Sequence, residues 1–145
     1  MRIDFYLVPD GDPRGRYLTA CRLTEKAYRL GHRIYIQTES EQTAALLDDL
    51  LWTFRQNSFV PHARWPAGEQ PETPVFLGTA EPPEFLDDVL INLSDAVPST
   101  FDRFARLVEI VDQDETGKEA GRRRFRFYRD RGLTPATHKL ESASD

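Results

Sequence analysis

Cysteine is almost absent from this chain of 145 residues. Cys21 is the single one, so a disulfide within the chain is excluded and the composition suits a reducing compartment. Long apolar runs are also missing, since no stretch approaches the roughly 18 apolar residues of a membrane-spanning helix. The first residues, MRIDFYLVPD, contain neither a long apolar core nor a small-residue cleavage site. We therefore expect a cytoplasmic protein that is neither membrane-bound nor secreted.

Motifs that bind nucleotides are missing as well. A dinucleotide-binding turn needs the spacing G-x-G-x-x-G, whereas the first turn here reads PDGDPRGRYL over residues 9–18. The phosphate-binding pattern G-x-x-x-x-G-K-[ST] occurs nowhere. We therefore expect neither a nucleotide cofactor nor a small-molecule substrate.

Metal-binding and catalytic clusters are equally scarce. The three histidines, His32, His62 and His138, lie far apart, whereas a zinc site needs several cysteines or histidines at short spacing. The carboxylate pairs at 48–49 and 87–88 are sequence neighbours, which do not face each other on a helix. These observations predict no metal, no cofactor, no catalytic residues and no enzymatic activity.

Charge is unevenly spread along the chain. Residues 1–117 hold 11 Lys and Arg against 20 Asp and Glu, a balance of −9. Residues 118–145 hold 8 against 4, a balance of +4. An acidic body repels nucleic acid over most of its surface, while the basic end attracts an anion such as a phosphate or a carboxylate-rich peptide.

Short apolar runs alternate with stretches of helical periodicity. The pattern predicts strands at 3–8, 33–37, 75–78, 88–93 and 107–111, and helices at 17–30, 40–54, 98–105 and 114–131. The proline-rich segment 61–74 is predicted to be a loop. Because several strands are apolar on both faces, we predict an α/β fold, a Rossmann-like three-layer sandwich with a mainly parallel sheet and no nucleotide-binding loop. We expect residues 1–140 to form one domain and residues 141–145 to form a mobile tail.

The last predicted helix carries a stripe of cations around an aromatic ring. Spacings of three or four residues place the following side chains on one face: Lys118, Arg122, Phe125, Arg126 and Arg129. Such a stripe suits an anionic ligand with an aromatic tip, whose carboxylate pairs with Arg122 or Lys118 above a floor of Phe125 and Val111. Two alternatives stay open, a solvated basic helix face and direct binding of nucleic-acid phosphates.

A second unusual segment is rich in large apolar side chains. Trp52 and Phe59 flank a predicted helix end and loop, and Val60 and Pro61 follow. Not all of these groups easily face one core, so an exposed patch for a protein partner is one interpretation. The alternative is that Trp52 and Phe59 close the core of the domain.

The run LDDLLWTFRQNSFVPH at 47–62 resembles the chi-subunit family of bacterial DNA polymerase III, in which a Leu-Asp-x-x-Leu-Trp helix leads into Ser-Phe-Val-Pro-His. Other segments agree with this family in order and spacing. They are FYL at 5–7, GHRIYI at 31–36, LINL at 90–93, and the arginine-rich end with Tyr128-Arg129 and Gly132. The similarity spans nearly the whole chain.

The resemblance implies a non-catalytic, replisome-associated adaptor with a Rossmann-like fold. Such proteins pair with the psi subunit of the clamp loader and bind the acidic tail of single-stranded DNA-binding protein, which ends in Asp-Asp-(Ile or Leu)-Pro-Phe; their link to DNA is indirect. Position by position, the tail-binding residues implied here are Val111, Lys118, Arg122, Phe125 and Arg126. The psi-binding residues implied are Trp52, Phe59, Val60 and Pro61. The family often has Tyr at position 125 and Lys at position 126.

Overall fold

Seven strands form one parallel sheet in the part of the chain that the computed structural model describes, residues 1–9, 14–66 and 72–141. Their order across the sheet is β3-β4-β2-β5-β6-β1-β7. The strands are β1 (Arg2–Leu7), β2 (Ile34–Gln37), β3 (His62–Arg64), β4 (Val75–Gly78), β5 (Val89–Asn92), β6 (Arg106–Val111) and β7 (Ala136–Lys139). Residues 10–13 of the first turn, 67–71 of the predicted loop and 142–145 of the predicted tail lie outside the described residues.

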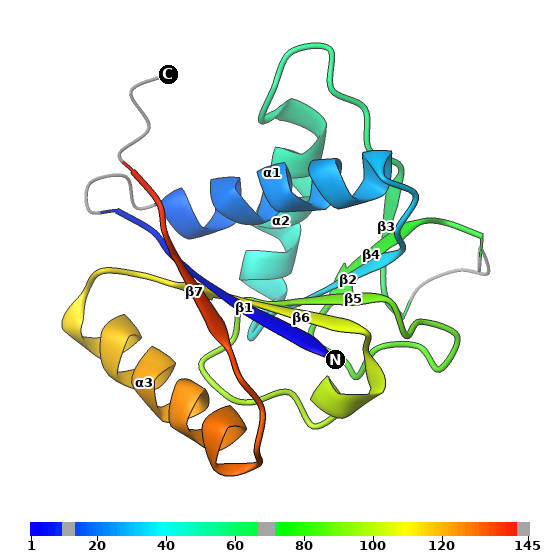
Figure 1. The fold of residues 1–145 in the computed structure, drawn as a ribbon. Coiled ribbons are helices and arrows are strands. Elements are labelled where there is room, and N and C mark those ends of the chain that lie inside the picture. The colour runs from blue at the N-terminus through cyan, green and yellow to red at the C-terminus, as the bar shows by residue number, and fades with distance from the viewer. Residues whose placement is uncertain (10–13, 67–71, 142–145) are drawn as a thin grey trace.

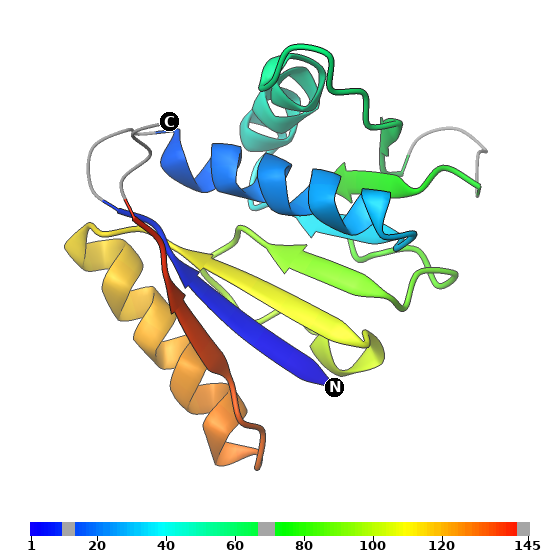
Figure 2. The ribbon, with the colours of Figure 1, turned by 45° about the horizontal axis from the view of Figure 1, so that its top comes forward.

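Helices cover both faces of this sheet. They are α1 (Gly15–Arg29), α2 (Glu41–Thr53), the short 3₁₀ helix η1 (Phe101–Arg103) and α3 (Glu115–Asp130). Helices α1 and α2 lie on one face, and α3 lies on the other (Figures 1 and 2). The predicted three-layer α/β sandwich is therefore confirmed.

Two of the strands, β3 and β7, were not predicted from the sequence. β3 lies inside the segment 61–74 that was predicted to be a loop, and β7 follows the last predicted helix. β3 has only three residues between prolines, and three of the four residues of β7 are exposed, so neither shows the apolar run typical of a buried strand. The helix predicted at 98–105 is reduced to the single turn of η1.

Apolar side chains form a separate core on each face of the sheet. Ile34, Ile36 and Leu51 belong to the core beneath α1 and α2, whereas Phe5 and Phe76 belong to the core on the α3 side. Cys21 is fully buried, and burial raises the pKa of its thiol to about 12. A thiol in this environment stays protonated and acts as a small apolar side chain.

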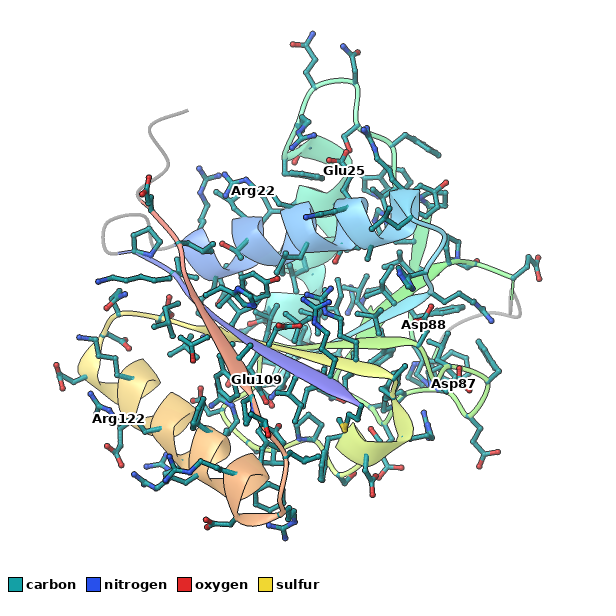
Figure 3. The ribbon with its side chains drawn as sticks, viewed as in Figure 1. Arg22, Glu25, Asp87, Asp88, Glu109 and Arg122 are labelled. Carbon is teal, nitrogen blue, oxygen red and sulfur yellow. The ribbon has the colours of Figure 1, made fainter. Side chains whose placement is uncertain are left out.

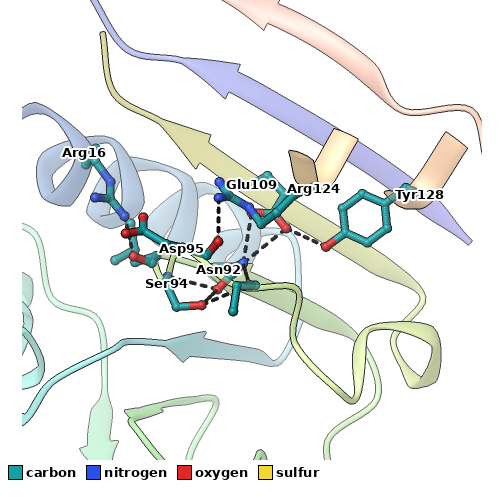
Figure 4. Close-up of polar contacts among 9 residues, drawn as sticks. Arg16, Asn92, Ser94, Asp95, Glu109, Arg124 and Tyr128 are labelled. Carbon is teal, nitrogen blue, oxygen red and sulfur yellow. Dashed lines mark hydrogen bonds and ion pairs between the residues drawn. The ribbon is translucent and has the colours of Figure 1, made fainter. Parts of the chain in front are cut away.

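A buried polar network fastens α3 to the sheet (Figure 4). The Glu109 carboxylate of β6 accepts hydrogen bonds from Arg124 Nε at 2.8 Å, Tyr128 Oη at 2.6 Å and Asn92 Nδ2 at 3.0 Å. Arg124 also donates to the carbonyl oxygen of Asp95 at 3.2 Å. Burial raises the pKa of Glu109, while the charge of Arg124 and the three donors favour its carboxylate form. The network therefore sets where α3 crosses the strands.

A second buried carboxylate fastens the edge of the sheet. Asp4 of β1 pairs with Arg106 Nε of β6 at 2.9 Å, with His138 Nε2 of β7 at 2.8 Å and with Arg2 Nε at 2.8 Å. Burial alone raises the pKa of Asp4, but hydrogen bonds from His138 and Arg106 and the charges of Arg106 and Arg2 outweigh it and lower the pKa. Asp4 therefore holds β7 beside β1 in its ionised form.

Replacing Glu109 by glutamine should destabilise the fold strongly. Glu109→Gln leaves Arg124 buried without its counter-ion, which costs about 3 kcal/mol of unfolding free energy. Urea unfolding followed by circular dichroism measures the loss. Glu119→Gln, on the exposed face of α3, is the matched control and should change the unfolding free energy by less than about 0.5 kcal/mol. Equal stabilities for the two variants would contradict the structural role of Glu109.

The contribution of Asp4 should depend on pH. Because its folded-state pKa is lowered, its stabilising effect is present above the unfolded pKa of about 3.9 and is lost as the pH falls through the folded pKa. Asp4→Asn should therefore melt at a lower temperature than the wild type at pH 7, and the gap should shrink in increasingly acidic buffer. A gap that stayed constant down to acid pH would contradict this account.

Candidate cleft on α3 and exposed aromatic patch

A cleft of about 300 Å³ opens between α3 and the strands β1, β6 and β7. Ten side chains or backbones line it: Phe5, Leu7, Val111, Asp112, Gln113, Lys118, Gly121, Arg122, Phe125 and Thr137. Its base is apolar and its rim is charged. The cleft lies near the carboxyl ends of the adjacent parallel strands β1 and β6. These two strands are followed in the chain by helices on opposite faces of the sheet, α1 and α3 (Figure 2), and open α/β sheets place their ligands at such positions.

Gly121 allows α3 to lie close to the end of β6. A Cβ atom at this position would come within 2.9 Å of Val111 Cγ1, which is closer than real side chains tolerate. Val111 is the last residue of β6 and is buried, so its side chain forms the floor of the cleft where the helix passes over it. A larger residue at position 121 would push the helix away from this floor.

Phe125 supplies the aromatic wall of the cleft. Its ring is half-buried and lies 5.2 Å from the ring of Phe5, centroid to centroid, in a tilted arrangement. Tyr128, one turn further along α3, is fully buried and anchors the same face of the helix to the sheet. The exposed part of Phe125 therefore offers an apolar surface, while Phe5 packs against the ring and Tyr128 anchors the helix that carries it.

Two cations reach the rim from α3. The Arg122 side chain is 57% exposed, and its nearest acidic neighbour is Glu119 at 3.5 Å, an exposed pair that contributes little (Figure 3). Lys118 is half-buried and forms no ion pair with any described residue. Both side chains remain available to an anion.

Four of the five predicted peptide-binding residues meet in this cleft: Val111, Lys118, Arg122 and Phe125. Arg126 does not line it, and its exposed side chain lies next to the cleft on the same helix. Arg126 is therefore placed to interact with a part of a ligand that extends beyond the cleft.

Sequence patterns did not single out the other lining residues. Phe5, Leu7 and Thr137 come from strands far from α3 in the sequence, and Asp112 and Gln113 belong to the turn that leads into the helix. Asp112 Oδ2 lies 3.6 Å from Arg16 Nη1, so its charge is partly balanced. Burial raises the pKa of Asp112, with the charge of Arg16 acting in the opposite direction.

Trp52 and Phe59 form an exposed aromatic patch at the end of α2. Trp52 is 46% exposed and Phe59 is 68% exposed, and their ring centroids lie 5.4 Å apart. The alternative that both rings close the core is therefore wrong. Val60, in contrast, is completely buried, so its predicted role on this surface is corrected to that of a core residue. Pro61 is half-buried beside it.

The loop that carries Phe59 is held by a buried glutamate. Glu25 of α1 pairs with Arg55 Nη1 at 2.7 Å and accepts a hydrogen bond from Ser58. On the other side of the patch, the ring of His62 lies 4.3 Å from that of Trp52, and its nitrogens contact oxygens of Val60 and Asp48. These contacts hold the two aromatic side chains of the patch in place. Nothing in the sequence pattern indicated the role of Glu25.

The described residues contain neither a metal-binding cluster nor a membrane-spanning helix. Within residues 1–9, 14–66 and 72–141, no three histidine, cysteine or carboxylate side chains gather in a way that could hold a metal ion. In the same ranges, no helix is both long and apolar enough to span a membrane.

Comparison with known proteins agrees with the resemblance seen in the sequence. The family model described as DNA polymerase III chi subunit, HolC, matches residues 1–136. The DNA polymerase III subunit chi of Pseudomonas aeruginosa is 42% identical over 139 residues, which cover 96% of each chain. The subunit chi of Escherichia coli is 32% identical over 145 residues, covering 93% of this chain and 97% of the relative. The subunit chi of Haemophilus influenzae is 31% identical over 124 residues, covering 83% and 85%. The chain therefore belongs to the DNA polymerase III chi subunit family.

Proposed function

We propose that the chain links DNA polymerase III to template coated with single-stranded DNA-binding protein, by holding the acidic C-terminal tail of that protein in the α3 cleft. Membership of the chi family implies a role in DNA replication. The observation that carries the proposal is the convergence of an apolar floor, an aromatic wall and two accessible cations in one cleft. A peptide that ends in phenylalanine presents the complementary groups, an aromatic ring next to a carboxylate.

The chemistry of the cleft assigns a role to each part of such a tail. The terminal phenylalanine ring packs against Phe125 and over Val111, where apolar surface is removed from water. Its α-carboxylate pairs with Arg122 by charge-assisted hydrogen bonds. The aspartates that precede it meet Lys118 and Arg126. No covalent step is involved, so the mechanism is recognition.

Such a contact is small and should be reversible. A peptide of this size is expected to bind with micromolar affinity, about −8 kcal/mol. Because Arg122 and Arg126 are exposed, added salt should weaken the interaction. Many tails surround each coated stretch of DNA, so a high local concentration would compensate for the modest affinity of one cleft.

The exposed pair Trp52 and Phe59 supports a second contact, with the psi subunit of the clamp loader. Aromatic side chains that are exposed but rigidly held are typical of the energetic centre of protein interfaces. This patch lies at the end of α2, on the opposite face of the sheet from α3 (Figure 2). Both partners could therefore bind at the same time, as an adaptor requires.

Direct binding of nucleic acid by α3 is the alternative function. Arg122, Arg123, Arg126 and Arg129 are all exposed on this helix. Against this alternative stand the acidic body of the protein and the lack of several exposed aromatic rings on the described part of α3 for base stacking. The experiment that tests the first proposal also includes an oligonucleotide.

Reversing the charge of Arg122 should abolish binding of the tail. Fluorescence anisotropy of a peptide ending in Asp-Asp-Ile-Pro-Phe, labelled at its N-terminus, should show micromolar binding to the wild type and a loss of about 30-fold or more for Arg122→Glu. Arg22→Glu makes the same charge change on the exposed face of α1 and should bind like the wild type. A labelled oligonucleotide should stay free.

Two outcomes of this titration would overturn the proposal. If the oligonucleotide binds while the peptide does not, α3 is a nucleic-acid contact. If Arg22→Glu weakens peptide binding as much as Arg122→Glu does, the effect is one of net charge and the cleft is not the site.

Removing the exposed aromatic rings should weaken binding of psi without affecting the tail. Trp52→Ala and Phe59→Ala should each reduce the affinity for purified psi by about 30-fold, the size expected for an aromatic interface anchor. Isothermal titration calorimetry measures this loss. Leu30→Ala, which removes another highly exposed apolar side chain, serves as the control. Unchanged binding of psi by both aromatic variants would exclude the patch as the interface.

A further inference from the structure

Strand β7 forms the edge of the sheet beside the cleft. It pairs with β1 on one side, and β7 is the last strand in the order of the described sheet. Three of its four residues are exposed, and one of these, Thr137, lines the cleft. A ligand that leaves the cleft on this side therefore meets the edge of the sheet directly.

The backbone of β7 presents hydrogen-bonding groups at this edge that pair with none of the described residues. The N–H of Leu140 donates to the carbonyl oxygen of Leu7 at 3.0 Å, so Leu140 faces β1. In an extended strand, the N–H and C=O of successive residues point to opposite sides. His138 therefore faces β1 as well, whereas the N–H and C=O groups of Thr137 and Lys139 point away from the sheet. A further strand could pair with these groups.

The side chain of Lys139 gives this edge a positive charge on the side of the cleft. Paired residues of neighbouring strands point to the same face, and Lys139 is paired with Leu7, which lines the cleft. Lys139 is exposed and forms no ion pair with any described residue. Lys118 and Arg122 of α3 line the cleft, and Lys139 adds a cation outside it, on the strand edge next to Leu7.

We propose that an acidic peptide whose carboxyl end occupies the cleft continues along β7 as an added strand, with a carboxylate side chain paired to Lys139. This inference rests on the proposed binding of a peptide in the cleft and extends it to the residues that precede the peptide's end. Main-chain hydrogen bonds to Thr137 and Lys139 supply affinity that depends little on side chains, and Lys139 selects for acidic residues.

Charge favours this occupant over a second copy of the chain. Two copies paired edge to edge would bring their Lys139 side chains close together, and a lysine on a short edge strand is a common device against such pairing. An acidic peptide, in contrast, satisfies both the cation and the backbone groups.

The test compares two peptides that share the ending Asp-Asp-Ile-Pro-Phe. One has five residues, and the other carries five more at its N-terminus, including two aspartates. The wild type should bind the longer peptide about tenfold more tightly, a gain that a few added hydrogen bonds can supply. Lys139→Ala removes the charged side chain but keeps the outward N–H, so it should keep part of the gain. Lys139→Pro also removes the outward N–H and should abolish the gain, leaving binding of the short peptide unchanged.

Amide hydrogen exchange of the wild-type protein provides a measurement that needs no variant. The longer peptide should slow exchange at Thr137 and Lys139, while the short peptide should leave these two amides fast. Equal affinities for both peptides, or unprotected amides at these positions, would overturn the edge-strand proposal while leaving the cleft intact. Failure of the wild type to bind the short peptide would instead overturn the proposed function. Gel filtration in which the wild type runs as a dimer and Lys139→Pro runs as a monomer would also overturn the edge-strand proposal.

Discussion

The buried carboxylate of Glu109 is the interaction on which the α3 side of the molecule depends. Arg124 and Tyr128 reach it from the helix, and Asn92 reaches it from the next strand (Figure 4). An ion pair of this kind is costly to bury, and it is tolerated because the Glu109 carboxylate accepts hydrogen bonds from three side chains and the Arg124 guanidinium donates to both Glu109 and the Asp95 carbonyl oxygen. Its consequence is positional, because it fixes the helix in a place where Arg122 and Phe125 face the cleft.

Much of the fold could be predicted from the sequence because buried parallel strands appear in it as short apolar runs. The apolar runs that became β2, β4 and β5 are short, β-branched or aromatic, and covered on both faces, as the sandwich requires. The edge strands of the sheet were harder to predict. β7 reads ATHK, and its pairing with β1 depends on Asp4 and His138 meeting across more than a hundred residues of chain, which no local pattern contains.

The candidate cleft shows the same division between local and tertiary information. Helical spacing alone brought Lys118, Arg122 and Phe125 onto one face, because one turn of helix relates neighbouring members of the set. The opposite wall could not be foreseen, since Leu7 and Thr137 join it only through the pairing of β1 with β7. The family resemblance predicted a peptide-binding role for Lys118, Arg122 and Phe125, and the geometry of the cleft offers a physical reason for that prediction.

The most direct test of the central claim is a nuclear magnetic resonance titration of the isotopically labelled protein with the unlabelled peptide Asp-Asp-Ile-Pro-Phe. The account predicts that the largest chemical-shift changes occur at the backbone amides of Val111, Gly121 and Phe125, because these residues surround the terminal phenylalanine ring. Changes concentrated around Trp52, or no changes under saturating peptide, would contradict the account.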